Sequence, residues 1–275
     1  MKIYELLKWA EEKLAESCER PLFEAELLLA YHLQKERTFL HAFDREEVED
    51  IEGYRTLVNR RANHEPYEYI VGSASFYDIE LDVEAGVLIP RPETELLIDL
   101  VTEIIEKENL QNIAEIGVGS GAISIVLARK FPHLDIIATD IESAPIKVAE
   151  QNAKKYGVQE QITLMKTNLL DNVGKQIDLV VSNPPYIADD FKLEKNVSEY
   201  EPKTALFGGV VGDELLKEIV LEVKRRKIRF LACEMGYDQK EPLEIFFEEN
   251  GIKNYKFYQD LAGFDRGFII VLEYN

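Results

Sequence analysis

The sequence predicts an α/β fold: a doubly wound, mostly parallel sheet, preceded by a small helical bundle and a β-hairpin linker. Two observations predict it. Residues 1 to about 65 carry helical periodicity without a strand pattern, and from residue 112 onward short apolar strands alternate with helices. A chain of 275 residues also has room for two domains of ordinary size. We expect domain boundaries at residues 1–70, 71–92 and 93–275.

The first 65 residues predict three helices. One apolar face runs along the N-terminal segment through Ile3, Leu6, Leu7, Ala10 and Leu14. Pro21 is suited to the first turn of a second helix over "LFEAELLLAYHL". We expect Asp44 to cap a third helix, "REEVEDIEGYRTLVNRRA". β-rich residues around Gly72 then predict the hairpin that links the two halves.

The second half predicts a parallel sheet. Its strand candidates are "NIAEIG", "DIIATD", "ITLMKT", "IDLVVSN", "IRFLACEMG" and a terminal pair. Runs such as "DLVVS" are apolar without strict alternation, as expected of strands that are buried on both faces. Helices predicted from Gly121 and through "APIKVAEQNAKKYG" separate the first three strands. Alternating strands and helices of this kind form doubly wound sheets.

Charge and composition disfavour several classes of protein. The formal net charge is -20, and the only short basic run, Lys224–Lys227, suits a helix C-terminus, so direct nucleic-acid binding is disfavoured. No apolar stretch is long enough to cross a bilayer, and the N-terminus reads as an amphipathic helix and not as a signal peptide. Two distant cysteines, Cys18 and Cys233, fit packing residues in a reducing cytoplasm. The four histidines lack metal-ligand spacing, so no metal site is expected.

A glycine-rich turn follows the first predicted strand. In "AEIGVGSGAISIVLA", Gly117, Gly119 and Gly121 let the backbone turn tightly and approach a ligand. Asp140 ends the next strand, where a carboxylate can accept hydrogen bonds from both hydroxyls of a ribose. These residues alone leave two enzyme classes open: a nicotinamide- or flavin-dependent oxidoreductase and an S-adenosylmethionine-dependent methyltransferase.

The stretch "VVSNPPYIADD" favours the methyltransferase. Pro184 and Pro185 lack backbone donors and fix φ, which makes a rigid loop between Asn183 and Tyr186. The Asn183 side-chain oxygen and the Pro184 carbonyl can hold the two hydrogens of a planar NH2 group and favour the partly cationic nitrogen that develops during methyl transfer. Tyr186 can cover the face of that group. An oxidoreductase has no use for such a loop.

The wider sequence resembles the release-factor glutamine methyltransferase family (PrmC/HemK) over nearly the whole chain. Besides the Asn-Pro-Pro-Tyr motif, the resemblance rests on "VLIPRPETELLI", "EPKTALFGG", "EMGYDQ", "DLAGFDRG" and the helical N-terminal block. It implies a class I, Rossmann-like methyltransferase that methylates N5 of the glutamine in the Gly-Gly-Gln motif of bacterial peptide-chain release factors, in translation termination. Residues 1–70 would dock the protein substrate, residues 71–92 would link the domains, and residues 93–275 would carry the catalytic domain.

The resemblance also assigns site residues. The catalytic residues would be Asn183, Pro184, Pro185 and Tyr186. The S-adenosylmethionine-binding residues would be Gly117, Val118, Gly119, Ser120, Gly121, Asp140, Asn168, Leu169 and Asn183. Asn168 departs from the family, which usually has an acid there, and relatives often carry a threonine within the glycine turn, where this chain has Val118 and Ser120. The role of residues 89–95 stays open between a structural hinge and a direct contact with the methionine end of the cofactor or with the substrate.

Several alternatives remain at this point. A ribosomal-protein glutamine methyltransferase would share the catalytic half and differ in its docking domain. A nucleic-acid N6-adenine methyltransferase would need a target-recognition domain and a different charge. A non-catalytic binding module would leave the Asn-Pro-Pro-Tyr motif unexplained. We expect a monomeric, cytoplasmic enzyme without direct nucleic-acid or membrane binding.

Overall fold

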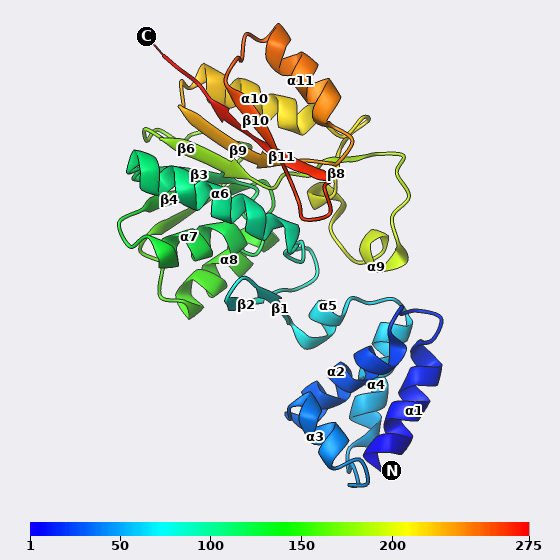
Figure 1. Ribbon diagram of the computed structural model, residues 1–275. Coiled ribbons are helices and arrows are strands. Elements are labelled where there is room, and N and C mark those ends of the chain that lie inside the picture. The colour runs from blue at the N-terminus through cyan, green and yellow to red at the C-terminus, as the bar shows by residue number, and fades with distance from the viewer. Residues whose placement is uncertain (275) are drawn as a thin grey trace. The chain divides into compact units, whose positions relative to one another are not determined.

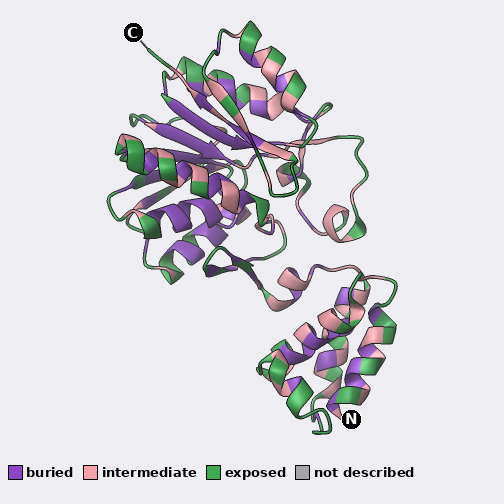
Figure 2. Cartoon of the chain, viewed as in Figure 1, coloured by how far each residue is buried: buried purple, intermediate pink, exposed green. Residues whose placement is uncertain are grey.

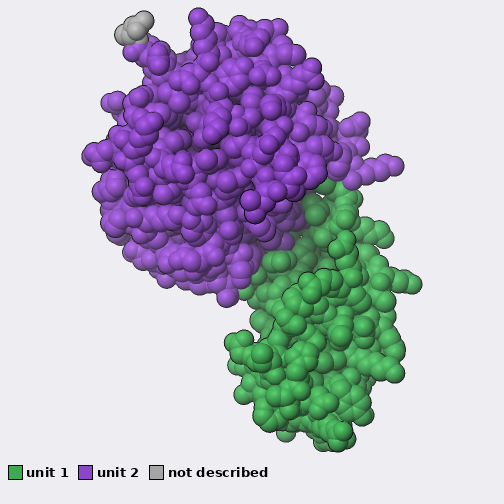
Figure 3. Space-filling view, viewed as in Figure 1, with its two compact units in different colours: residues 1–73, 193–200 green, residues 74–192, 201–275 purple. Residues whose placement is uncertain are grey.

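The computed structural model describes residues 1–274, which form two compact units (Figure 3). The first unit contains residues 1–73 and 193–200, and the second contains residues 74–192 and 201–274. The chain therefore leaves the helical unit at residue 73 and contributes eight further residues to it at 193–200. The expected continuous blocks 1–70, 71–92 and 93–275 do not include this returning segment.

The first unit is a helical bundle around its own apolar core. Its helices are α1 (Ile3–Leu14), α2 (Pro21–Leu33), α3 (Arg37–Ala42), α4 (Ile51–Ala62), α5 (Tyr67–Val71) and α9 (Lys195–Ser198). The apolar stripe predicted for the first helix is buried in full. The Tyr54 hydroxyl, inside this core, donates to the Ala25 carbonyl at 3.0 Å, and Arg61 pairs with Glu24. Burial of the helix faces stabilises the bundle.

The predicted start of the third helix is wrong. α4 begins at Ile51, and its cap is Asp50, whose Oδ1 accepts a hydrogen bond from the Gly53 amide at 2.9 Å. The segment 44–48 instead accepts hydrogen bonds from the start of α1. The Ile3 and Tyr4 amides donate to the carbonyls of residues 46 and 44 at 3.0 Å. The segment therefore satisfies the free amides of one helix and cannot begin another.

A two-stranded hairpin follows the bundle, as the sequence predicts. It consists of β1 (Ser73–Phe76) and β2 (Ile79–Asp82). Gly72 ends α5 in the left-handed conformation, at φ 79°, which only glycine adopts without cost. The hairpin joins the second unit through Asn152, whose side-chain Oδ1 accepts from the Asp82 amide at 2.8 Å.

The predicted doubly wound sheet is confirmed. Seven strands lie in the order β10-β11-β9-β6-β3-β4-β5, and the five from β9 to β5 are parallel (Figure 1). The strands are β3 (Asn112–Ile116), β4 (Asp135–Asp140), β5 (Ile162–Lys166), β6 (Leu179–Ser182), β9 (Phe230–Glu234), β10 (Tyr255–Gln259) and β11 (Asp265–Val271). The C-terminal pair β10–β11 adds the antiparallel edge.

Helices cover both faces of this sheet. The core on one face contains residues of α6 (Glu93–Glu108), α7 (Ala122–Lys130) and α8 (Ser143–Lys155). The core on the other face contains residues of α10 (Glu214–Arg225) and α11 (Lys240–Glu249). The central strands are buried along their length (Figure 2), which explains their unbroken apolar runs.

The strand order reverses beside β3. β4 and β5 follow on one side of it, whereas β6 and β9 lie on the other. Ligands of open α/β sheets bind at such a switch point, outside the carboxyl ends of the strands. After β6 the chain forms a short parallel pair, β7 (Ile187–Ala188) with β8 (Phe207–Gly209), and the 3-10 turn η1 (Lys203–Ala205).

Within residues 1–274, no helix is both long and apolar enough to span a bilayer.

Candidate functional site

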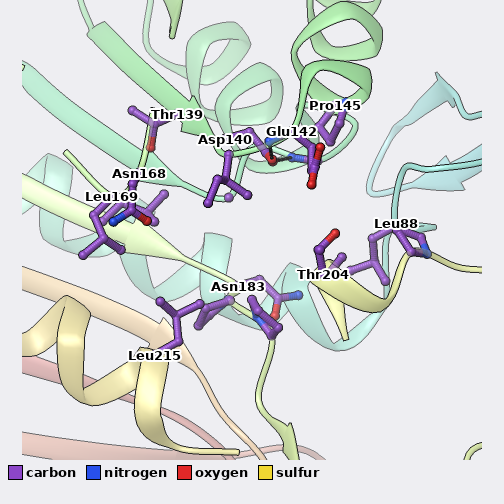
Figure 4. A pocket seen from close by; sticks show the side chains of 18 of the residues that line it. Leu88, Thr139, Asp140, Glu142, Pro145, Asn168, Leu169, Asn183, Thr204 and Leu215 are labelled. Carbon is purple, nitrogen blue, oxygen red and sulfur yellow. Dashed lines mark hydrogen bonds between the residues drawn. The ribbon is translucent and has the colours of Figure 1, made fainter. Parts of the chain in front are cut away.

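A cavity of about 330 Å³ opens at the carboxyl ends of β3, β4 and β6 (Figure 4). Its volume is in the range of small-molecule pockets. Its walls are largely apolar, with a few polar groups that come from separate strand ends. The lining residues are Gly86, Leu88, Ile116, Gly117, Gly119, Thr139, Asp140, Ile141, Glu142, Pro145, Thr167, Asn168, Leu169, Asn183, Pro184, Pro185, Pro202, Thr204, Ala205, Phe207, Gly208 and Leu215.

The glycine turn after β3 is held open toward this cavity. The Gly117 and Val118 amides both donate to the Thr139 carbonyl at 2.9 Å, which ties the turn to the end of β4. Gly117 and Gly119 have φ values of 78° and 54°, in the left-handed region. No side chain therefore stands between this backbone and a ligand.

A buried carboxyl group supports the turn from below. Glu115 is 1% exposed and accepts hydrogen bonds from the Ser124 amide, at 3.0 Å, and from the Ser124 hydroxyl. These bonds join the end of β3 to the first turn of α7. Burial raises the pKa of Glu115 to about 8, although the two hydrogen bonds oppose the shift.

Asp140 lies at the end of β4, at the rim of the cavity. Its Oδ2 accepts from the Gly119 amide at 3.2 Å, and its Oδ1 accepts from the Glu142 amide at 3.0 Å. The carboxylate is thereby fixed, and each oxygen keeps further lone pairs that can accept from a ligand. Burial raises the pKa of Asp140, and the backbone donors act against that increase.

Asn168 and Leu169 line the cavity on the β5 side (Figure 4). Leu169 has φ 45°, a left-handed conformation that costs a non-glycine residue of order 1–3 kcal/mol. The following chain holds it there, because the Asp171 amide donates to the Asn168 carbonyl at 2.9 Å. Such strain is common at ligand-binding sites.

The Asn-Pro-Pro-Tyr loop follows β6 and faces the glycine turn. The Asn183 Nδ2 donates to the Thr94 hydroxyl at 2.8 Å, so the Asn183 Oδ1 is the end of the amide that remains as an acceptor. None of the hydrogen bonds described for residues 1–274 ends on this Oδ1 or on the Pro184 carbonyl. Two acceptors on one rigid loop are therefore available to a ligand that carries two hydrogens.

Residues outside the motif fix the loop on its other side. An added Cβ on Gly208 would lie 2.5 Å from the Pro185 carbonyl oxygen and 2.4 Å from that of Gly212. Only glycine permits this approach. The Gln239 side chain also donates from Nε2 to the Tyr186 carbonyl at 2.8 Å. The loop is rigid because its prolines restrict it and because its neighbours pack directly against its backbone.

Tyr186 is anchored and does not line the cavity. Its hydroxyl donates to Glu234 Oε1 at 3.0 Å, and its ring packs against the apolar core. Burial raises the pKa of this phenol, as does the Glu234 carboxylate. The phenol is therefore a fixed hydrogen-bond donor at neutral pH.

The structure brings together most of the residues that the sequence predicted. Gly117, Gly119, Asp140, Asn168, Leu169, Asn183, Pro184 and Pro185 line one cavity. Val118, Ser120, Gly121 and Tyr186 are not among its lining residues. Val118 and Ser120 are each 3% exposed and serve the packing of the turn.

Sequence reasoning missed several residues of the site. Glu142 and Pro145 follow Asp140 in the β4–α8 connection, so their place after a strand end was a usable signal. Leu88, Thr204 and Leu215 come from distant segments, and no local pattern marks them. Thr94 and Glu234 contact the Asn-Pro-Pro-Tyr motif through hydrogen bonds. They lie in "VLIPRPETELLI" and "EMGYDQ", which supported the family resemblance without indicating a role for either residue.

Comparison with known proteins places this site in a family. Residues 5–72 match the model of the PrmC N-terminal domain, and residues 93–200 match that of the methyltransferase small domain. A release factor glutamine methyltransferase of Dictyoglomus turgidum is 42% identical over 83% of this chain and 83% of its own length. One from Clostridium botulinum is 36% identical over 88% of this chain and 89% of its own. The chain belongs to the release factor glutamine methyltransferase family. The resemblance seen in the sequence is thereby confirmed.

Solved structures agree on the fold of this family member. The catalytic domain of human METTL16, in complex with the MAT2A 3'UTR hairpin 6, has a TM-score of 0.58 at 18% identity, and the match covers 79% of this chain and 80% of that one. The N-terminal domain of human METTL16 in complex with SAH gives 0.54 at 19% identity, with 71% and 76% covered. At these identities the likeness shows the class I methyltransferase fold alone.

S-adenosylmethionine is the methyl donor of this methyltransferase. The cavity fits it on three counts. Its volume accommodates a nucleoside-sized ligand, its walls are apolar, and Asp140 presents lone pairs at the rim. The glycine turn adds backbone that a ligand can approach closely.

Proposed function

We propose that this enzyme methylates N5 of the glutamine in the Gly-Gly-Gln motif of bacterial peptide-chain release factors. The observation that carries the proposal is the pair of acceptors, Asn183 Oδ1 and the Pro184 carbonyl, on a rigid loop at the cavity. A primary amide has two hydrogens on a planar nitrogen, which match two acceptors. Family membership supports glutamine as the residue that carries this amide.

The cavity residues would hold the cofactor by distinct means. Asp140 would accept hydrogen bonds from the ribose hydroxyls, and Asn168 would meet the adenine amino group through its side-chain oxygen. Gly117 and Gly119 would lie against the ligand with their backbone, while Leu169 supplies apolar contact. When bound, the cofactor supplies a methyl group already activated on a sulfonium.

Asn183 and Pro184 would make the amide nitrogen reactive. An amide is a poor nucleophile because its lone pair is delocalised into the carbonyl group. Acceptors that hold both hydrogens stabilise the pyramidal, partly cationic nitrogen of the transition state more than the planar ground state. Fixed acceptors also orient the nitrogen, and such positioning supplies several kcal/mol of rate acceleration.

The remaining roles follow from the division of the chain. Residues 1–70 would dock the release factor, residues 71–92 would serve as linker, and residues 93–275 would perform catalysis. With a net charge of -20, the enzyme would bind its protein substrate without direct contact to nucleic acid or membrane. We expect it to act as a monomer in the cytoplasm.

Mass spectrometry of a methylation reaction tests the proposal. The full-length enzyme is incubated with S-adenosylmethionine and an unmodified bacterial release factor, and separately with a ribosomal protein that carries a methylatable glutamine. We expect one added methyl group on the Gly-Gly-Gln glutamine alone. Methylation of the ribosomal protein instead would retain the chemistry and change the substrate. Absence of transfer to either protein, despite cofactor binding, would refute the proposal.

A further inference from the structure

A chain of buried hydrogen bonds continues from Asn183 away from the cavity. The Asn183 Nδ2 donates to Thr94 Oγ1 at 2.8 Å, and Thr94 Oγ1 donates to Glu234 Oε2 at 2.7 Å. The other carboxylate oxygen, Oε1, accepts from the Tyr186 hydroxyl at 3.0 Å. Thr94 and Glu234 are 4% and 2% exposed, so water does not compete for these bonds.

The number of hydrogens that each group carries determines which group donates in each of these hydrogen bonds. A threonine hydroxyl has a single hydrogen, and here the Glu234 carboxylate takes it. The Thr94 oxygen can then only accept from Asn183. An amide presents NH2 at one end and oxygen at the other, so the NH2 end must face Thr94 and the oxygen end must face away.

We propose that Thr94 and Glu234 are positioning residues that fix the Asn183 side-chain oxygen toward the substrate. This inference rests on the proposed function, in which that oxygen accepts a hydrogen of the amide substrate. Thr94 lies in the 89–95 segment, at the start of α6, and Glu234 at the end of β9. None of residues 89–95 is among the lining residues of the cavity, so Thr94 would act on catalysis through its hydrogen bond with Asn183.

We call the hydrogen bonds that join Tyr186, Glu234, Thr94 and Asn183 the relay. The direction of these hydrogen bonds depends on the charge of Glu234. An ionised carboxylate can only accept hydrogen bonds, whereas a protonated one can donate to Thr94 and reverse the hydrogen bonds. Thr94 would then donate to the Asn183 oxygen and turn it away from the substrate. Burial raises the pKa of Glu234 to about 7, and the donors Thr94 and Tyr186 oppose that shift.

Other groups around Glu234 adjust this pKa. Glu93, beside Thr94, raises the pKa, and Arg266 of β11 lowers it. Tyr258 of β10 is also near the carboxylate, and burial together with the Glu234 charge raises the pKa of that phenol. The ionised form predominates above the pKa, so methyl transfer should be lost as pH falls through about 7.

Substitutions at Thr94 test the relay directly. In Thr94→Val, which keeps the shape and removes the hydroxyl, we expect kcat to fall about 10²-fold, because the amide loses its orientation. Thr94→Ser restores the hydroxyl and should recover most of the loss, with the Kd for S-adenosylmethionine unchanged in both variants. Thr102→Val, the same substitution further along α6 at a hydroxyl that has no hydrogen-bond partner within residues 1–274, is the matched control and should retain wild-type kcat. A wild-type kcat in Thr94→Val would overturn the proposal.

The pH profile of kcat distinguishes the relay from a purely structural contact. Wild type and Thr94→Ser should lose activity toward acid pH. Glu234→Gln removes the titrating group and should remove this acid limb, and Glu93→Gln should move it to lower pH. An acid limb that persists unchanged in Glu234→Gln would overturn the role of that carboxyl.

A measurement without substrate separates this proposal from the proposed function. The side-chain NH2 signal of Asn183, assigned by its absence in Asn183→Ala, is followed by ¹⁵N NMR as the pH changes. It should titrate near pH 7 in wild type and not in Thr94→Val. Titration without methylation of a release factor would support the relay and refute the function. A flat signal in wild type would overturn the relay even if methylation occurs.

Discussion

The Asn183 side chain ends in an amide that donates hydrogen bonds from its nitrogen and accepts them at its oxygen. Its proposed role as an acceptor for the substrate therefore depends on which of the two atoms faces the cavity. Asn183→Ala removes one of the two acceptors and the bond to Thr94. We expect kcat to fall by at least about 10²-fold, the typical effect of one lost hydrogen-bonding group at a transition state. The cofactor Kd, measured by calorimetry, should change little. Full activity in this variant would contradict the two-acceptor mechanism.

Asp140 should act on binding and not on the transfer step. Asp140→Ala removes the carboxylate that its two backbone donors fix at the rim. Charge-assisted hydrogen bonds contribute about 1.5–3 kcal/mol, so the Kd for S-adenosylmethionine should rise roughly 10- to 100-fold. Asp135→Ala, at the exposed opposite end of β4, is the control and should leave the Kd unchanged. An equal Kd for S-adenosylmethionine in the two variants would show that Asp140 does not bind the ribose.

For single residues, the sequence predicted those whose function shows in a short local motif. The glycine turn and the carboxylate at a strand end have recognisable positions, and Asn183 lies in a motif that no sheet requires. Thr94 and Glu234 were not predicted, because their roles arise from hydrogen bonds between residues far apart in the chain. Only the folded structure shows that the 89–95 segment meets Asn183.

Among the helices and strands, the start of α4 has two candidate N-cap residues, Asp44 and Asp50. The sequence favoured Asp44 as cap, whereas the structure uses Asp50. Asp50→Ala should therefore destabilise the protein by about 1 kcal/mol, the usual cost of a lost N-cap. Asp44→Ala, on the exposed turn before it, should have a smaller effect. Denaturant unfolding of both full-length variants measures the difference, and the reverse order would restore the sequence prediction.

The contact between β8 and the Asn-Pro-Pro-Tyr loop gives a second prediction. In Gly208→Ala the new methyl group would meet the Pro185 and Gly212 carbonyls. The resulting shift should cost about 1–3 kcal/mol of stability and displace the loop, with a loss of kcat. Gly174→Ala is a matched control, since no atom lies within 4 Å of its added Cβ. Wild-type stability and kcat in Gly208→Ala would show that the loop tolerates displacement.

Strands were easier to predict from sequence than loops. Buried parallel strands leave continuous apolar runs, and all five of those predicted for the parallel part of the sheet are present. The turn before α4 was misread, because its backbone satisfies α1 amides that are distant in sequence. The structure groups residues 193–200 with residues 1–73, and no local pattern in the sequence marks this return of the chain. Long-range partners of this kind leave no local pattern.

For the molecule as a whole, the net charge of -20 is the feature that the fold leaves unexplained. A strongly acidic enzyme attracts a basic protein surface, and a release factor loop that meets ribosomal RNA would provide one. Such attraction raises association rates at low salt and is screened as ionic strength increases. The KM for the intact release factor should therefore rise, roughly tenfold, between low and high salt.

A peptide substrate separates this effect from catalysis. A short Gly-Gly-Gln peptide without basic residues makes the contacts at the loop but lacks the charged surface, so its KM should depend little on salt. The kcat for both substrates and the Kd for S-adenosylmethionine, measured over the same range of salt, should also stay nearly constant, because the cavity is largely apolar. If the KM values for peptide and intact protein rise together with salt, the charge of the enzyme does not act on docking, and its acidity serves solubility alone.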